Sequence, residues 1–464
     1  MKKLICILLF LTPVLVHAQQ NGYKSSMSDY MWQNIGNAGI SSGDAELPSL
    51  AFSPAGDPYL AYYDVSNFFN MTTTVKKFDG ANWINVGPEG FDTAGPPNLA
   101  FSPAGEPYIA YKDYYLNKAT VMKFDGSDWV SVGMKGFSAG SVSSMSFAFS
   151  PSGNPYVAYA DGNNNRKMTV MKYNGTQWIN VGNPYFSMGD VEYTSLAFNP
   201  SGEPYVAYQD WANAKYMTVM KFTGFNWVNV GTPGFSAGET YWSSLAFGPD
   251  GQPYVAFMDG GNSFMATTMK FDGNNWVNVG NAGFSAGSAQ CMSLAFSPSG
   301  QPYVSYNDGE NAFKATLMKF DGTNWVNVGN PGFSAGESIY TSLAFGPSGQ
   351  PFVAFQDRLN AGKITVMKYD SVTVGLTEHQ GSGLSVYPNP ATGFITVETS
   401  MDARESLLSI TNMHGKDLIT RQINEAKTMI DISTLPPGIY FIRVQNDKTI
   451  ATGKLINSIF GVKY

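Results

Sequence analysis

A repeated unit of fixed length occupies most of this chain, and its period restricts the possible folds more than any other feature. A proline recurs at one position of the unit, and successive copies are 48 or 49 residues apart. The copies are Pro54, Pro103, Pro151, Pro200, Pro249, Pro298 and Pro347. A constant period in this range is typical of solenoids, propellers and arrays of small modules.

Each unit contains four short strand signals, which predict an all-β fold. In the sixth unit they are Ser293–Phe296, Pro302–Tyr306, Thr316–Phe320 and Trp325–Val328. Asp321-Gly322 between the last two is a strong hairpin signal, and no helical 3.6-residue stripe runs through the unit. Seven copies of a four-stranded antiparallel unit predict a seven-bladed β-propeller.

The ring is predicted to close with an N-terminal strand. The fourth-strand tryptophan of the unit occurs seven times, at Trp32, Trp83, Trp129, Trp178, Trp227, Trp276 and Trp325. The last unit lacks it, whereas Met31–Gly36 near the start of the chain matches the NWVNVG pattern. We therefore expect Met31–Gly36 to complete the last blade and remove its open edge. The alternative is Ser371–Gly375, which has a similar pattern without the tryptophan.

The chain ends and the composition predict an exported protein. Residues 1–18 have the charged start, apolar centre and small-residue end of a signal peptide. We then expect a short lead at 19–30, the propeller at 31–370, a linker at 371–383 and a C-terminal domain at 384–464. The rest of the chain contains no second long apolar run, so we predict no transmembrane segment. Cys6 leaves with the signal peptide, so Cys291 would be the single thiol of the mature chain.

The last 80 residues carry ordered motifs of their own. These are LSVYPNP at Leu384–Pro390, LSITNMHG at Leu408–Gly415, LPPGIYFIRV at Leu435–Val444 and TGKLI at Thr452–Ile456. The segment, about residues 384–457, resembles the type A C-terminal sorting domain of the type IX secretion system. The resemblance implies a small Ig-like β-sandwich, recognition by the type IX machinery, and release or attachment at the outer cell surface of a Gram-negative bacterium.

Charge and residue usage exclude several functional classes. A net charge of −7 without a basic cluster disfavours nucleic-acid binding. The three histidines lie outside the ring, so the ring lacks the histidine that a Ser/His/Asp triad or a histidine-bound metal requires. We predict no catalytic residue, metal or cofactor. A glycosidase using two carboxylates stays an alternative, with Asp190, Glu192 and Glu239 as scattered candidates.

Residues repeated in every blade are predicted to serve the scaffold. An aspartate ends the second strand of each unit, at Asp64, Asp113, Asp161, Asp210, Asp259, Asp308 and Asp357. Seven carboxylates in a ring would suit cations or sugar hydroxyls, but we favour capping of loop N–H groups. The repeated tryptophans are expected to pack between blades.

Function is expected on the face where the loops vary. The loops after strands two and four share one face, and the loop after strand two changes strongly from blade to blade. Two unrepeated tryptophans lie there with other polar and aromatic residues, giving the candidate binding residues Trp211, Tyr216, Glu239, Tyr241 and Trp242. We expect Trp242 to close the loop that crosses into its blade. Aromatic platforms beside a carboxylate favour binding of a glycan or another extracellular polymer. A protein-binding adhesion module and a carbohydrate-active enzyme are the alternatives.

Overall fold

The computed structural model describes residues 28–66, 71–373, 384–400, 403–412, 416–446 and 450–458. The predicted signal peptide, most of the lead and linker residues 374–383 lie outside the described residues. The chain forms two compact units, one of them Tyr30–Ser371 and the other containing the C-terminal strands. Within the described ranges, no helix is long and apolar enough to cross a membrane.

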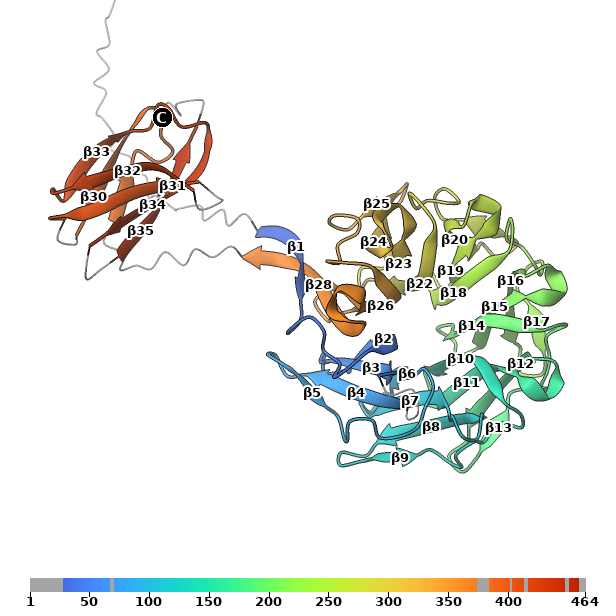
Figure 1. The fold of residues 1–464 in the computed structure, drawn as a ribbon. Coiled ribbons are helices and arrows are strands. Elements are labelled where there is room, and N and C mark those ends of the chain that lie inside the picture. The colour runs from blue at the N-terminus through green and yellow to red at the C-terminus, as the bar shows by residue number, and fades with distance from the viewer. Residues whose placement is uncertain are drawn as a thin grey trace, which may run out of the picture. The chain divides into compact units, whose positions relative to one another are not determined.

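Tyr30–Ser371 form a closed ring of seven four-stranded sheets (Figure 1), which confirms the predicted propeller. The innermost strands are β2 (Ala45–Phe52), β6 (Asn98–Phe101), β10 (Val142–Phe149), β14 (Val191–Phe198), β18 (Thr240–Phe247), β22 (Ala289–Phe296) and β26 (Ser338–Phe345). The second strands are β3 (Pro58–Asp64), β7 (Pro107–Lys112), β11 (Pro155–Asp161), β15 (Pro204–Asp210), β19 (Pro253–Asp259), β23 (Pro302–Asp308) and β27 (Pro351–Asp357). The third strands are β4 (Thr72–Phe78), β8 (Ala119–Phe124), β12 (Lys167–Tyr173), β16 (Tyr216–Phe222), β20 (Met265–Phe271), β24 (Lys314–Phe320) and β28 (Lys363–Thr373). The outermost strands are β5 (Trp83–Asn85), β9 (Trp129–Ser131), β13 (Trp178–Asn180), β17 (Trp227–Asn229), β21 (Trp276–Asn278), β25 (Trp325–Asn327) and β1 (Ser28–Asn34).

The N-terminal strand closes the ring as predicted. The last sheet has the order β1-β28-β27-β26, so β1 is its outermost strand. The indole Nε1 of Trp32 donates a 2.9 Å hydrogen bond to the carbonyl of Val328 in the preceding blade. The alternative, a fourth strand at Ser371–Gly375, is wrong because Ser371–Thr373 simply continue the third strand β28.

The repeated tryptophans join neighbouring blades, which confirms their scaffold role. The Nε1–H of each one donates to a backbone carbonyl of the preceding blade over 2.7–2.9 Å. Six of the seven indoles also stack on a phenylalanine of that blade, with ring centroids 3.7–5.0 Å apart. Each indole is therefore held by both burial and a directed hydrogen bond, the pattern expected of structural tryptophan.

The repeated aspartates cap loops, which confirms the second scaffold prediction. In five blades the aspartate is the N-cap of a short 3₁₀ helix: η1 (Gly162–Asn164), η2 (Trp211–Asn213), η3 (Gly260–Asn262), η4 (Gly309–Asn311) and η5 (Arg358–Asn360). Asp259 is representative: its carboxylate accepts from Gly261 N, Asn262 Nδ2 and Thr267 Oγ1 at 2.8–3.0 Å. In each of these five blades the carboxylate accepts from a loop N–H, although Asp161 Oδ2 is buried without a hydrogen-bond partner, so these aspartates serve the loops.

The innermost strands are longer than predicted. We expected Ser293–Phe296, and β22 instead begins at Ala289. The pairing register shifts between Gln290 and Ser293, which marks a β-bulge, and the same shift recurs in most blades. The bulge interrupts the alternation of inward and outward residues. The first half of each strand therefore looks like loop in the sequence.

The C-terminal unit is a two-sheet β-sandwich, as the resemblance implied. One sheet has the order β29 (Leu384–Tyr387), β30 (Phe394–Thr399), β33 (Lys427–Asp431). The other has the order β32 (Asp417–Ile423), β31 (Ser406–Thr411), β34 (Gly438–Gln445), β35 (Ile450–Asn457). Alternate residues from both sheets, including Ile395, Leu408, Ile442 and Leu455, form one buried core.

Candidate functional site

Bulge residues of the inner strands bring the unrepeated aromatic side chains to the centre of the ring. One residue of each bulge has a left-handed backbone: Leu47, Ser144, Tyr193, Trp242, Cys291 and Tyr340, with φ of 47–57°. Their strands β2, β10, β14, β18, β22 and β26 surround the axis (Figure 1). Positive φ is costly for large residues and is often found where function requires it. We call Tyr193, Trp242 and Tyr340 the axial wall.

Two members of the axial wall, Tyr193 and Trp242, are in contact across neighbouring blades. The rings of Tyr193 and Trp242, from consecutive blades, have centroids 5.8 Å apart. The pKa of Tyr193 is raised, first by burial and then by Glu192 and by Cys291, which is two blades further on. The pKa of Tyr340 is raised by burial, then by Glu46 and Cys291. Because Tyr193, Cys291 and Tyr340 all belong to innermost strands, we refer to the end of the ring axis beside these residues as the mouth.

Four of the five candidate binding residues join this wall. Tyr241 lies 6.1 Å from Trp242, ring to ring, and its hydroxyl donates to Glu239 Oε2 over 2.8 Å. That hydrogen bond is the main cause of the raised pKa of Tyr241. Glu239 Oε2 is 3.9 Å from Lys215 Nζ, which in turn lies 4.5 Å above the ring of Trp211. Trp211, 45% exposed, is therefore linked to the axis through Lys215 and Glu239.

The remaining candidate, Tyr216, has a different position. It begins β16 and pairs with Asp210, and its Cβ lies against Gly234 in the loop that follows β17. Among the described contacts, nothing joins it to the other four residues. The expectation that Trp242 lies in a crossing loop is also wrong, because Tyr241 and Trp242 belong to β18. Their bulge explains why the sequence looked irregular there.

An acidic pair beside the wall surrounds an arginine. Arg166 Nη2 is 2.6 Å from Glu192 Oε1, and Arg166 Nε is 3.4 Å from Asp190 Oδ1. Burial raises the pKa of Asp190, and Arg166 opposes that rise. Asp190 and Glu192 were only scattered acids in the sequence; the fold places them on one guanidinium. No group of three or more His, Cys, Asp or Glu suited to a metal occurs in the described part of the chain.

Sequence reasoning missed Tyr193, Lys215 and Arg166. Arg166 and Lys215 hold the same position in consecutive blades, just after the short helices η1 and η2, with φ of 55° and 62°. The corresponding residues in the next two blades are Phe264 and Phe313. Variation in charge and size at one position of the loop was visible in the sequence. Only the positive φ and the next blade's inner strand reveal that this position faces the mouth.

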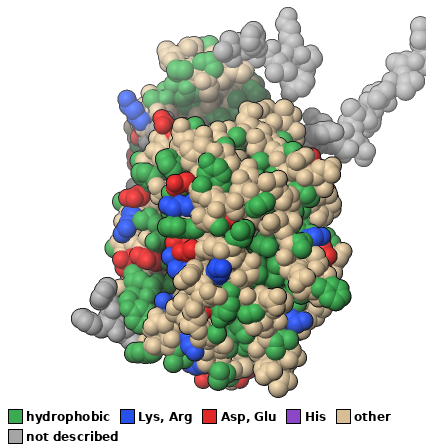
Figure 2. All heavy atoms as spheres, turned by 90° about the vertical axis from the view of Figure 1, so that its right-hand side faces the viewer, with side chains coloured by type: hydrophobic (Ala, Val, Ile, Leu, Met, Phe, Trp, Pro, Cys, Tyr) green, Lys and Arg blue, Asp and Glu red, His purple; other side chains and the backbone are tan. Residues whose placement is uncertain are grey.

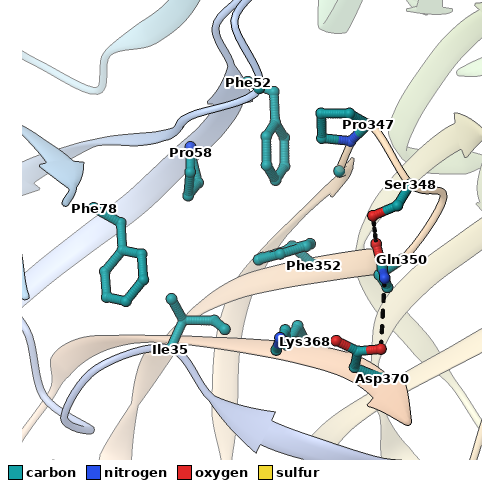
Figure 3. Close-up of a pocket in the computed structure, with 12 residues that line it drawn as sticks. Ile35, Phe52, Pro58, Phe78, Pro347, Ser348, Gln350, Phe352, Lys368 and Asp370 are labelled. Carbon is teal, nitrogen blue, oxygen red and sulfur yellow. Dashed lines mark hydrogen bonds and ion pairs between the residues drawn. The ribbon is translucent and has the colours of Figure 1, made fainter. Parts of the chain in front are cut away.

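A hollow of about 270 Å³ lies elsewhere, between the first and last blades (Figure 3). Phe52, Phe78 and Phe352 line it together with Lys368 and Asp370, whose charged atoms are 2.8 Å apart. Its rim consists of the turns that repeat in every blade, on the face opposite the variable loops. In the other six blades a tyrosine occupies the position of Phe352. The hollow is thus a local packing difference at the seam of the ring.

The outer surface shows no concentrated charge on the side drawn in Figure 2. Acidic and basic side chains lie intermixed there, and hydrophobic side chains are scattered among uncharged polar ones. This face offers no basic stripe of the kind that nucleic acids require.

Comparison with known proteins identifies the C-terminal unit. Residues 385–458 match the family described as the secretion system C-terminal sorting domain. This unit is therefore a type IX sorting domain, and it directs the protein to the cell surface. A search of curated proteins found no match to the chain.

Solved structures resemble the chain at the level of fold. PorZ, a surface component of the type IX secretion system of Porphyromonas gingivalis, is 14% identical with a TM-score of 0.48, over 92% of this chain and 61% of PorZ. A Dyadobacter fermentans protein of unknown function is 13% identical with a TM-score of 0.46, over 74% and 98%. The lectin SapL1 is 14% identical with a TM-score of 0.43, over 63% and 97%. A fold does not by itself determine function, so the function of this chain is argued from its site.

Proposed function

We propose that the ring is a non-catalytic binding module that holds a glycan, or a related extracellular polymer, at one site on the axial wall. The observation that carries the proposal is the convergence of unrepeated aromatics, Tyr193, Tyr241 and Trp242, with ring centroids 5.8–6.1 Å apart. Aromatic faces stack on the apolar faces of sugar rings, and neighbouring carboxylates accept sugar hydroxyls.

The arrangement supports one site per ring. A repetitive ring would offer a site in each gap between blades, but the indole–phenylalanine stacks fill those gaps. At the bulge position, the remaining blades with left-handed residues carry Leu47, Ser144 and Cys291. Large aromatic side chains therefore border one side of the mouth.

The acids of the site suit binding better than catalysis. A glycosidase holds an acid and a base on opposite sides of the sugar bond. Here Asp190 and Glu192 both approach Arg166, and Glu239 is held by Tyr241 and Lys215. This is an ion-pair network that positions side chains around the wall.

A glycan array probed with the wild-type protein and with Trp242→Ala tests the proposal. We expect Trp242→Ala to lower the affinity by about five- to thirtyfold, since stacking on one aromatic ring contributes on the order of 1–2 kcal/mol. Phe225→Ala is the matched control, because Phe225 is 85% exposed but lies in the turn after β16 on the opposite face. If the protein binds no glycan on the array and binds a protein ligand instead, the proposal is overturned in favour of an adhesion module.

A further inference from the structure

We propose that this site, taking the axial wall as the glycan-binding surface, selects uncharged glycans and rejects polyanionic ones. The two cations beside Tyr193, Tyr241 and Trp242 are Arg166 and Lys215, at the same position of consecutive blades, whereas a third, Arg358, acts electrostatically on Tyr340. A site for uronate or sulfate groups requires cations with free donors aimed at the ligand. The contacts of these two side chains decide whether such donors exist.

Arg166 is already paired with two carboxylates. Its Nη2 lies 2.6 Å from Glu192 Oε1, and its Nε lies 3.4 Å from Asp190 Oδ1. An arginine recognises an acidic ligand by presenting two parallel N–H groups to it. In this structure Glu192 is hydrogen-bonded to the end of that fork, whereas Nε on its inner side lies within ion-pair distance of Asp190 without a hydrogen bond to it. An incoming carboxylate would have to displace them.

Lys215 is paired in a similar way. Its Nζ lies 3.9 Å from Glu239 Oε2 and 4.5 Å from the centroid of Trp211. The indole face and the carboxylate partly balance the charge of the ammonium group, although Nζ is too far from Glu239 for a hydrogen bond. Lys215 thereby lies between Glu239 and Trp211, and a negatively charged ligand would compete with Glu239 for it.

The groups left facing the wall are acceptors. Glu192 acts electrostatically on both Tyr193 and Tyr241, raising the pKa of each, so its charge lies close to the aromatic surface. Glu239 accepts from the hydroxyl of Tyr241. Three carboxylates thus stand against two cations around these rings. Sugar hydroxyls can donate to such carboxylates, whereas ligand carboxylates or sulfates are repelled by them.

The experiment compares glycans that differ only in charge. Calorimetry measures the binding of three uncharged glycans: cellohexaose, mannohexaose and the methyl ester of hexagalacturonic acid. The binding of each is compared with that of the corresponding glycan that carries a carboxylate at C6. For every uncharged glycan that binds, we expect an affinity at least about tenfold higher than that of the corresponding acidic glycan. We also expect affinity for the uncharged form to change little with added salt. An acidic partner that binds as tightly as the uncharged form, through Trp242, would overturn the selectivity while leaving the binding site in place.

The variant Glu192→Gln gives an independent test. It removes one negative charge, keeps an acceptor oxygen, and releases part of Arg166. The affinity for the acidic form, divided by the affinity for the uncharged form, should then rise by about tenfold. No change in this ratio would contradict the proposed repulsion. Absence of binding by all six glycans and across the array would instead contradict the proposed function itself.

Discussion

Trp32 and Val328 are 296 residues apart in the chain, yet the indole of Trp32 donates to the carbonyl of Val328 across 2.9 Å. Trp32 also stacks on Phe333, with centroids 3.7 Å apart. These contacts join the first described strand to the blade before the last. The ring is thus held closed by ordinary inter-blade contacts that happen to connect distant parts of the chain.

Trp32→Ala should destabilise the ring. Removing a half-buried indole with its stack and hydrogen bond is expected to lower the free energy of unfolding by about 2–4 kcal/mol. Denaturant unfolding monitored by fluorescence measures this. Met31→Ala is the control on the same strand, because Met31 is 47% exposed, and it should change stability little. Equal stability of Trp32→Ala and wild type would mean that β1 does not hold the ring closed.

Loss of the whole closing strand should expose β28. A variant lacking residues 28–34 would leave the N–H and C=O groups of β28 unpaired at a sheet edge, which favours association between chains. Light scattering at increasing protein concentration should show larger species than the wild type. A strictly monomeric, equally stable variant would contradict the role assigned to β1.

Four hairpin turns should make the ring sensitive to acid. Backbone N–H groups lower the pKa of the aspartates that begin these turns, Asp79, Asp125, Asp272 and Asp321. A carboxyl with a pKa below its unfolded value of 3.8 stabilises the fold above that pH. The stabilisation is lost as the pH falls through the lower folded value.

The chain supplies a control for this prediction. Asn174 holds the corresponding position in another blade, where its Oδ1 accepts from Thr176 N and Gln177 N at 2.9 Å. Replacing the four aspartates by asparagine should therefore keep the turns while reducing the loss of stability from about pH 5 to about pH 2. Unfolding curves over this range measure the change, and an unaltered pH dependence would contradict it.

Cys291 should be unreactive in the folded protein. Burial raises the pKa of its thiol to about 12, and the side chain is 8% exposed. Since the thiolate is the reactive form, alkylation near pH 8 should require unfolding. A thiol-reagent titration with and without denaturant checks this. Rapid labelling of the native protein would show that the bulge of β22 opens.

Asn389 should stabilise the sorting domain. Its side chain donates to Lys454 O over 2.7 Å and accepts from Ile456 N over 2.8 Å, so it pairs with the last strand β35 like a short piece of backbone. Asn389→Ala should lower the stability of this unit by about 1–2 kcal/mol and reduce the amount of protein that reaches the cell surface. Cell fractionation and thermal unfolding measure both. Ser385→Ala, on the neighbouring strand, is the control.

The repeat predicted the ring, the closing strand and the scaffold residues, because a residue that recurs at the same position of all seven units serves the structure that the units share. Trp178 and Asp259 belong to seven-fold patterns that favour blade packing and loop capping. The sequence did not reveal the axial wall. Tyr193 and Trp242 adopt a left-handed backbone that large residues avoid, and this conformation depends on neighbouring blades. The link from Trp211 to Tyr241 through Lys215 likewise required coordinates.

Calorimetric titration with an uncharged glycan identified on the array tests the central claim most directly. The ring presents seven similar blades but, in this account, one aromatic wall at its axis. We predict about one ligand per ring and loss of that binding in Trp242→Ala. A stoichiometry close to the number of blades, unchanged by Trp242→Ala, would place binding in the repeated scaffold and contradict the account.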